Sequence, residues 1–243
     1  MPDIDTLAHI RVVLCDTSHP GNVGAAARAM KTMGLSALYL VNPRHFPDPQ
    51  AQWRAAHAGD VLAQARVCTS LDEALHGVAY AVACSARGRE VAVPAMNARD
   101  AAARVVEIAR DQTAALVFGN EASGLTTDDV NRCQLLATIP SNPQYSSLNL
   151  AAAVQVMTYE IRLAALAPAV TEASGKLARH EQVEGFYEDL EQTMVDIGFL
   201  DPLYPRKLMP RLRRLFARTA LEDEEINILR GLLKALRNPV KRS

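Results

Sequence analysis

The 243-residue chain predicts an α/β fold built on a mostly parallel sheet, followed by a small helical extension. Short runs of Val, Ile, Leu and Ala alternate with longer segments in which apolar residues recur every three to four positions. This alternation is typical of βαβ units, whose parallel strands are buried on both faces. The strand pattern does not return after residue 167. We therefore expect a sheet domain over residues 1–167, a linker over 168–184 and a helical extension over 185–243.

Six strands are expected in the sheet domain, each a short apolar run. They cover residues 10–16, 36–42, 66–69, 78–84, 114–118 and 133–139. A glycine loop over 21–24 and a helix to Met33 follow the first strand, and a long apolar helix follows residue 148. Further helices are expected over 51–58, from 70, over 97–110 and at 126–130, and three more in the extension.

Short polar sequences mark several helix ends. Capping-box patterns begin at Ser70 and Thr219, where a hydroxyl and an acid three residues later exchange hydrogen bonds with backbone N–H groups. Asn97 is expected to cap the helix that follows it, and Gly34 is expected just past the end of the first helix.

Composition excludes several protein classes. Hydrophobic residues make up 49% of the chain and charged residues 22%, as in ordinary globular proteins. No apolar run approaches the ~20 residues that cross a bilayer, so no membrane partner is expected. The acidic N-terminus lacks a signal-peptide pattern, which favours a cytoplasmic protein. The four cysteines form no CxxC pair, so we expect buried reduced thiols and no metal site.

The formal net charge of −1 conceals an uneven distribution. Residues 201–243 hold 11 Lys and Arg against 5 Asp and Glu, whereas residues 168–200 hold 2 against 7. Six of these cations lie within 206–218 with no acid between them. A solvated helix face is the simpler interpretation of a basic helix, but this density favours binding to a phosphate backbone.

Four loops follow predicted strands at the carboxyl edge of the sheet, after Asp16, Cys84, Phe118 and Ile139. Ligands of open parallel sheets bind at that edge, so these loops predict a binding site. The first loop is not the G-x-G-x-x-G pattern, and no acid ends the second strand, which argues against a dinucleotide.

Each candidate residue in these loops also has a structural interpretation. The glycines of the first loop can serve a tight turn, and Arg28 can be an ordinary surface or salt-bridged arginine. Glu121 can accept hydrogen bonds from an amine or pair with an arginine, or it can serve the fold by capping a helix or by forming a bridge that holds the loop. Ser146, Ser147 and Asn149 stand at a helix start, where one of them is expected to be the N-cap.

Three segments combine into a family pattern: NVGAAARAMKTMG (22–34), LVFGNEASGL (116–125) and IPSNPQYSSLNLAAAVQV (139–156). They resemble the three motifs of the SPOUT class of S-adenosylmethionine-dependent RNA 2′-O-ribose methyltransferases. The resemblance extends to VNP after the second strand, to CSARGR and to the basic tail. Within the class, the chain most resembles the branch that methylates nucleotide 32 (C or U) in the anticodon loop of tRNA.

The resemblance implies a Rossmann-like sheet whose C-terminal part is tied into a trefoil knot. It implies a homodimer with the site near the subunit interface. It also implies that the knot binds S-adenosylmethionine. The implied cofactor residues are Cys84, Ser85, Ala86, Gly119, Glu121, Gly124, Ile139, Ser146, Ser147 and Leu148. The family usually has threonine or another small residue where Cys84 stands, so we expect a backbone contact there.

The resemblance also implies the catalytic residues Arg28, Ser147 and Asn149. Methyl transfer to a ribose 2′-oxygen is an in-line displacement that needs no metal and depends on alignment. Arginine stays protonated at neutral pH. We therefore expect Arg28 to bind a phosphate and the ribose oxygen, and to stabilise developing alkoxide charge. The implied RNA-binding residues are Asn22, Arg28, Arg87, Arg211, Arg213 and Arg214.

Two alternatives stay open at this point. The enzyme could methylate another tRNA site or ribosomal RNA, although the basic tail favours the tRNA branch. Alternatively, the chain could be a non-catalytic RNA-binding protein of the same fold. The presence of Arg28, Glu121, Ser147 and Asn149 argues against that second alternative.

Overall fold

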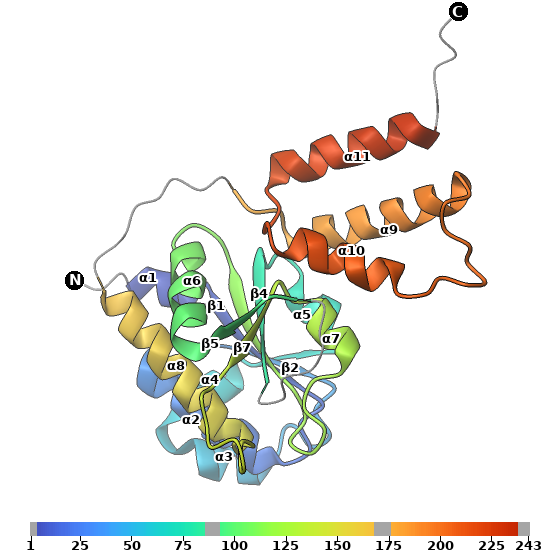
Figure 1. Ribbon diagram of the computed structural model, residues 1–243. Coiled ribbons are helices and arrows are strands. Elements are labelled where there is room, and N and C mark those ends of the chain that lie inside the picture. Colours follow the sequence, from blue (N-terminus) through green and yellow to red (C-terminus); the bar gives the residue numbers. More distant parts are fainter. Residues whose placement is uncertain (1–3, 86–92, 168–175, 238–243) are drawn as a thin grey trace, which may run out of the picture.

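The computed structural model describes residues 4–85, 93–167 and 176–237. Within these residues, seven strands form one sheet with the order β3-β2-β1-β6-β4-β7-β5, and every neighbouring pair is parallel (Figure 1). The strands are β1 (Ile10–Cys15), β2 (Ala37–Val41), β3 (Arg66–Cys68), β4 (Tyr80–Cys84), β5 (Ala95–Asn97), β6 (Ala114–Phe118) and β7 (Leu135–Thr138). The predicted α/β fold is confirmed. The knot stays a prediction, because strand order and pairing do not define it.

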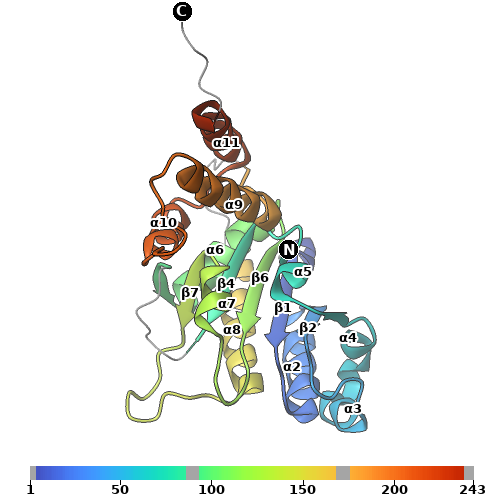
Figure 2. The same cartoon turned by 90° about the vertical axis from the view of Figure 1, so that its right-hand side faces the viewer.

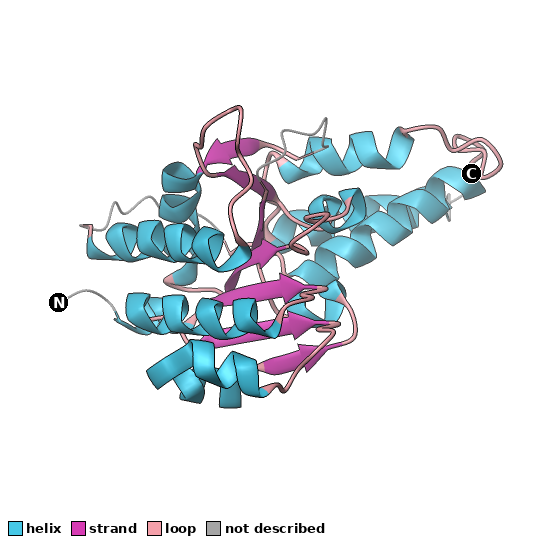
Figure 3. Ribbon diagram, turned by 90° about the horizontal axis from the view of Figure 1, so that it is seen from below, coloured by secondary structure: helices cyan, strands magenta, loops and turns pink. Residues whose placement is uncertain are grey.

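Helices cover both faces of the sheet (Figure 3). The helices of this domain are α1 (Ile4–Ala8), α2 (Pro20–Met33), α3 (Pro49–Ala55), the 3-10 helix η1 (Ala56–Ala58), α4 (Gly59–Ala63), α5 (Leu71–Leu75), α6 (Ala98–Ala109), α7 (Thr127–Asn131) and α8 (Leu150–Leu166). Helices α2, α3, α6 and α8 bury residues in the core on one face, and α5 and α7 in the core on the other.

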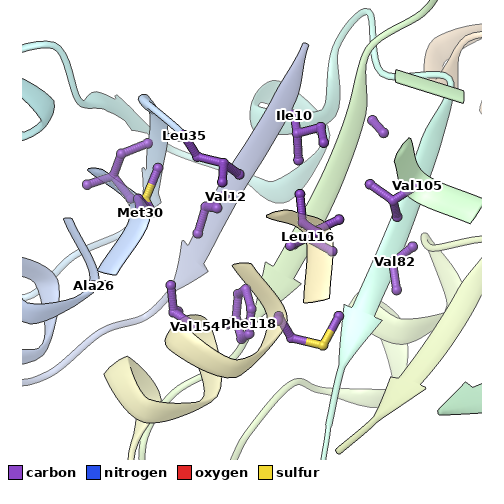
Figure 4. Packing of buried hydrophobic residues seen from close by; sticks show 14 of the residues in the cluster. Ile10, Val12, Ala26, Met30, Leu35, Val82, Val105, Leu116, Phe118 and Val154 are labelled. Carbon is purple, nitrogen blue, oxygen red and sulfur yellow. The ribbon is translucent and has the colours of Figure 1, made fainter. Parts of the chain in front are cut away.

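Strand β1 shows why the sheet strands read as continuous apolar runs. Val12 and Leu14 lie in the first core, part of which Figure 4 shows. Val13 and Cys15 lie in the second core. Both faces of the strand are therefore removed from water, as expected for a parallel sheet.

The first helix begins earlier than its glycines suggest. Helix α2 starts at Pro20, so Gly21, Asn22 and Gly24 lie in its first turns and the predicted flexible loop is wrong. Pro suits this position, because its fixed φ is helical and it lacks the N–H that would go unpaired. Gly24 serves close packing, since a Cβ there would lie 2.0 Å from the carbonyl oxygen of Ala51 on α3.

Other boundaries show how local signals compete with tertiary packing. Asn97 caps α6 by accepting a hydrogen bond from the Asp100 N–H, as expected. Gly34 has φ 89° and ends α2, also as expected. Strand β5 was not expected, because its three residues are exposed and lack an apolar alternation.

All four cysteines are free thiols, and only Cys84 is not fully buried.

The extension contains three helices, as predicted. They are α9 (His180–Asp196), α10 (Leu208–Ala217) and α11 (Asp223–Arg237). Helix α9 begins inside the expected linker of residues 168–184. The capping box at Thr219 is wrong: its hydroxyl donates to the Phe216 carbonyl, and α11 starts at Asp223. The rings of Phe186 and Phe216 pack edge to face, with their centroids 5.0 Å apart, in a small core separate from those of the sheet.

The extension attaches where the strands begin. The His180 N–H donates to the Val78 carbonyl, just before β4. The Gln112 side chain, just before β6, exchanges two hydrogen bonds with the backbone of Leu177. Figure 2 shows the three helices above this edge of the sheet, while the loops after β6 and β7 lie at the opposite edge. In the described part of the chain, no helix is long and apolar enough to cross a membrane.

Candidate active site

A pocket lies at the carboxyl edge of the sheet, where β4, β6 and β7 end. It encloses about 890 Å³ of space between atoms, part of which is open to solvent. Nine of the predicted cofactor residues line it: Cys84, Ser85, Gly119, Glu121, Gly124, Ile139, Ser146, Ser147 and Leu148. Ala86 and Arg87 lie outside the described residues. Loops from three distant parts of the sequence therefore meet at one cavity.

The pocket combines apolar walls with polar backbone. Phe118, Ala137 and Leu150 contribute buried side chains to the lining. Burial raises the pKa of the Cys84 thiol, so this side chain is a neutral surface of the pocket and not a nucleophile. Such a mixed lining is typical of sites for small organic ligands.

The loop after β6 folds tightly on itself. A Cβ at Gly119 would lie 2.1 Å from the backbone carbon of Gly124, so only glycine fits there. Gly124 has φ 71°, a conformation that favours glycine. The Asn120 side chain accepts from the Ala122 N–H and donates to the Asp16 carbonyl, which ties this loop to the end of β1.

Glu121 joins this loop to the start of α2. Its carboxylate accepts hydrogen bonds from the Ser18 N–H, the Ser18 hydroxyl, the His19 N–H and the Asn22 amide, at 2.8–3.2 Å. Partial burial opposes ionisation of Glu121, but the bonds from Asn22 and Ser18 outweigh it and lower its pKa to about 2. The carboxylate also lies at a helix N-terminus, where negative charge is favoured.

Asn22 connects Glu121 to the third loop. Its amide nitrogen donates to Glu121, and its amide oxygen accepts from the Asn149 amide at 3.0 Å. Asn149 in turn accepts from the N–H groups of Ala151 and Ala152 and is the N-cap of α8. Both ends of the Asn22 amide therefore have a partner, which indicates a positioning role; the RNA contact expected from the resemblance stays a prediction.

The serines of the third loop differ from one another. The Ser146 carbonyl accepts from the Ser141 hydroxyl, which braces the loop. Ser147 is exposed at the pocket, and its hydroxyl has no hydrogen-bond partner within the described residues. It is thus available to a ligand, while Asn149 performs the capping.

The predicted RNA-binding arginines divide into two groups. Arg28 is exposed on α2 and does not line the pocket. Arg211 and Arg214 are exposed on α10. Arg213 instead forms two hydrogen bonds of 2.7 Å with Glu184 and lies over the Tyr187 ring. Arg213 is therefore held inside the extension, which disfavours the predicted RNA contact.

Sequence reasoning missed Ser18 as a part of the site. Ser18 stands just before His19 and Pro20, where α2 begins. Its N–H and hydroxyl therefore donate to the Glu121 carboxylate at the N-terminus of this helix. The sequence signal that could have identified Ser18 is a polar residue two positions before the proline that begins a helix.

Comparison with known proteins agrees with this geometry. The family model described as the SpoU rRNA Methylase family matches residues 9–159, which hold the whole sheet and every loop at the pocket. The model described as the C-terminal domain of the tRNA methyltransferase TrmJ matches residues 181–243. The sheet and its pocket thus define a methylase of the SpoU family.

Similar proteins narrow the class. The chain is 48% identical over 239 residues to the tRNA (cytidine/uridine/adenosine-2′-O-)-methyltransferase TrmJ of Pseudomonas aeruginosa, covering 93% of each chain. The crystal structure of TrmJ from Z. mobilis ZM4 superposes with a TM-score of 0.82 at 34% identity, covering 94% of this chain and 99% of that one. An AdoMet-bound rRNA methyltransferase from Sinorhizobium meliloti is 28% identical, with a TM-score of 0.50 over 65% of this chain and 57% of that one. The chain belongs, within the SpoU family, to the TrmJ methyltransferases.

Proposed function

We propose that the protein transfers a methyl group from S-adenosylmethionine to the ribose 2′-oxygen of nucleotide 32, a cytidine or uridine, in the tRNA anticodon loop. The observation that carries this proposal is the pocket in which the loops after β4, β6 and β7 meet beside the Glu121–Asn22–Asn149 network. We expect this reaction in the cytoplasm.

The pocket suits the proposed methyl donor. The apolar side chains of Phe118, Ile139 and Leu150 offer contact to an aromatic base, and the loop backbones offer polar groups. The neutral Cys84 thiol adds no charge that would bind or repel the sulfonium. When bound, S-adenosylmethionine supplies the electrophilic methyl group.

The residues of this chain align the acceptor. Ser147 presents a free hydroxyl at the pocket, with which it can orient the ribose. Asn149 is fixed by its cap and by Asn22, so it holds Ser147 at a constant place. Alignment alone can supply much of the rate of an in-line transfer.

A homodimer accounts for the remaining exposed features. The exposed face of α8 carries Tyr159, Leu163 and Leu166, which are 48%, 39% and 51% exposed. This stripe supports a contact with a second copy. Because Arg28 does not line its own pocket, we propose that it reaches the RNA at that interface and binds a phosphate together with the ribose oxygen.

The extension offers a second contact for tRNA. Lys207, Arg211, Arg214 and Arg218 are exposed and follow one another at the i, i+4, i+7 and i+11 spacing of one helix face. A row of cations at this spacing can follow an RNA backbone.

The direct test has two parts. In the first, the protein is mixed with labelled S-adenosylmethionine and total tRNA, and methyl incorporation is measured. In the second, 2′-O-methyl groups are mapped in tRNA from cells with and without the gene. Methyl incorporation confined to nucleotide 32 is expected. Incorporation at another tRNA site, or into ribosomal RNA but not tRNA in a parallel reaction, would contradict the proposal. Binding of tRNA without incorporation would favour the non-catalytic alternative. The bases found at the methylated site also define the acceptor range.

An Arg28→Lys variant tests the role of the guanidinium. A single amine cannot hold a phosphate and the ribose oxygen in a bidentate manner, so activity should fall on the order of 10²-fold at every pH. The measurement is a pH–rate profile at saturating tRNA, with Lys31→Arg on the same helix as the matched control. Retention of most activity near neutral pH would rule out the bidentate role.

A further inference from the structure

We propose that Trp53, Arg44 and Arg54 form an additional RNA-binding surface beside the pocket, on which the indole stacks on an unpaired base and the two arginines contact phosphates. This inference rests on the proposed function in one respect, since it takes the RNA to be the anticodon arm of tRNA.

Trp53 has an unusual position for an indole. It is 81% exposed on the outer face of α3, because Ala51 and Ala55 on the same helix face inward and are buried. Large aromatic side chains are buried on average, and a free aromatic surface next to a nucleic-acid site is a typical platform for bases.

Arg44 and Arg54 flank the start of α2. The Arg44 N–H donates to the Thr17 carbonyl at 3.0 Å, which places this residue next to the Ser18 that holds Glu121. The Cγ of Arg54 lies 3.6 Å from the position that a Cβ on Gly21 would take. Neither guanidinium has a hydrogen bond or ion pair within the ranges that the structure describes.

The one acid between Arg44 and Trp53 in the sequence already has a hydrogen-bond partner. Asp48 is the N-cap of α3 and accepts from the Gln50 N–H at 2.7 Å. The surface therefore combines two unpaired cations with one bare aromatic ring.

A chain of close contacts connects Arg44 and Arg54 to the pocket. The path runs from Glu121 in the lining, through Ser18 at the start of α2, to Arg44 and Arg54. Figure 2 shows α3 at the same edge of the molecule as the loops after β6 and β7. RNA loops present unstacked bases together with phosphates, which is the chemistry that this combination fits. Because α2 separates Trp53 from the pocket, its base would belong to a neighbour of the methylated nucleotide.

The native fluorescence of the protein provides a direct test. Trp53 is the only tryptophan of the chain, so its emission reports this surface alone. Titration with an anticodon stem-loop RNA should quench the emission and saturate together with binding measured by anisotropy of a labelled RNA. S-adenosylmethionine alone should leave the emission unchanged. Saturated RNA binding with unchanged emission would overturn the proposal.

Variants extend the test to turnover. Trp53→Ala should raise the KM for tRNA about tenfold and leave kcat within about twofold, since one base–aromatic stack is lost. Trp53→Phe keeps a stacking ring and should restore most of the affinity. An Arg44→Glu/Arg54→Glu double variant should weaken RNA binding and flatten its salt dependence. Arg110→Glu, at the end of α6 on the opposite edge, is the matched control and should do neither.

The outcomes separate this inference from the proposed function. Unchanged KM values in Trp53→Ala and in the double variant, with tRNA still methylated, would reject the surface and leave the methyltransferase proposal intact. If tRNA is not methylated but the RNA still quenches Trp53, the surface stands and the reaction assignment fails.

Discussion

The two ends of the molecule use their carboxylates in opposite ways. At the pocket edge, Glu121 accepts from backbone, hydroxyl and amide groups, and elsewhere in the same domain the exposed Arg28, Arg44 and Arg54 have no carboxylate partner within the described residues. In the extension, acids pair with arginines. Glu184 pairs with Arg213, and Asp189 pairs with Arg230. Arg237 lies between Asp189 and Asp196 and pairs with both.

This difference shows that a count of cations does not locate a binding surface. The sequence is most basic in the extension, yet three of its arginines serve the fold. The sheet domain carries a slight acidic excess, yet its Arg28, Arg44 and Arg54 have no acidic partner within the described residues. Pairing with an acid identifies the cations that serve the fold, and a binding role should be sought among the others that lie near the site.

The largest expected effect concerns the acid at the pocket edge. In Glu121→Gln, the amide presents an N–H group to donors that all require an acceptor. The start of α2 and the loop after β6 should separate slightly, and misalignment of this size should lower kcat/KM for tRNA on the order of 10- to 100-fold. The measurement is single-turnover methylation, with Asp100→Asn in the cap of α6 as the control.

The pKa of Glu121 predicts that the stability of the folded state depends on pH. The pKa of Glu121 is about 2 in the fold, below the ~4.3 of a free glutamate, so ionised Glu121 stabilises the folded state. This stabilisation is complete above about pH 4.3 and is lost as the pH falls toward 2. The difference in Tm between wild type and Glu121→Gln should therefore shrink over that range. A constant difference would contradict the assigned role of the carboxylate.

A smaller effect should distinguish neighbouring arginines of α10. Arg213→Ala removes two charged hydrogen bonds and the contact with Tyr187, and should destabilise the extension by about 2–3 kcal/mol in denaturant unfolding. Arg211→Ala should leave stability unchanged within ~0.5 kcal/mol. It should weaken tRNA binding and reduce the salt slope by about 0.7–0.9. If the two variants exchange these phenotypes, the division into paired and free cations is wrong.

The smallest effect is expected for Arg230→Ala. Its partner is Asp189, and the two side chains are 48% and 32% exposed, so solvent screens the pair. The loss of stability should be under about 1 kcal/mol, with methylation unchanged. A change in tRNA affinity here would show that a paired arginine also contacts RNA.

Much of the fold could be predicted from local patterns. Parallel strands buried on both faces are continuous apolar runs, and the five runs at β1, β2, β4, β6 and β7 were found for that reason. Asn97 acts as a cap as predicted, because capping needs only a side chain and the next three N–H groups. The start of α2 at Pro20 was missed, because Gly21 and Gly24 favour a loop locally while packing against α3 requires a helix.

The site was predictable in its position but not in its connections. Strand ends indicated where the loops would meet, and the motif resemblance indicated which residues would line the pocket. The double role of Asn22 depends on Glu121 and Asn149, which lie 99 and 127 positions away. No local pattern reports such distances. The pairing of Arg213 was missed for the same reason, since Glu184 is 29 positions away.

The hydrogen bonds of the Glu121–Asn22–Asn149 network can run in only one donor-to-acceptor direction. Glu121 can only accept, so the Asn22 amide must donate to it and accept from Asn149, and the Asn149 oxygen must face the first N–H groups of α8. A single carboxylate is thereby linked through two amides to the starts of two helices. The orientation of both amides, and with it the cap of α8, therefore depends on Glu121 acting as an acceptor.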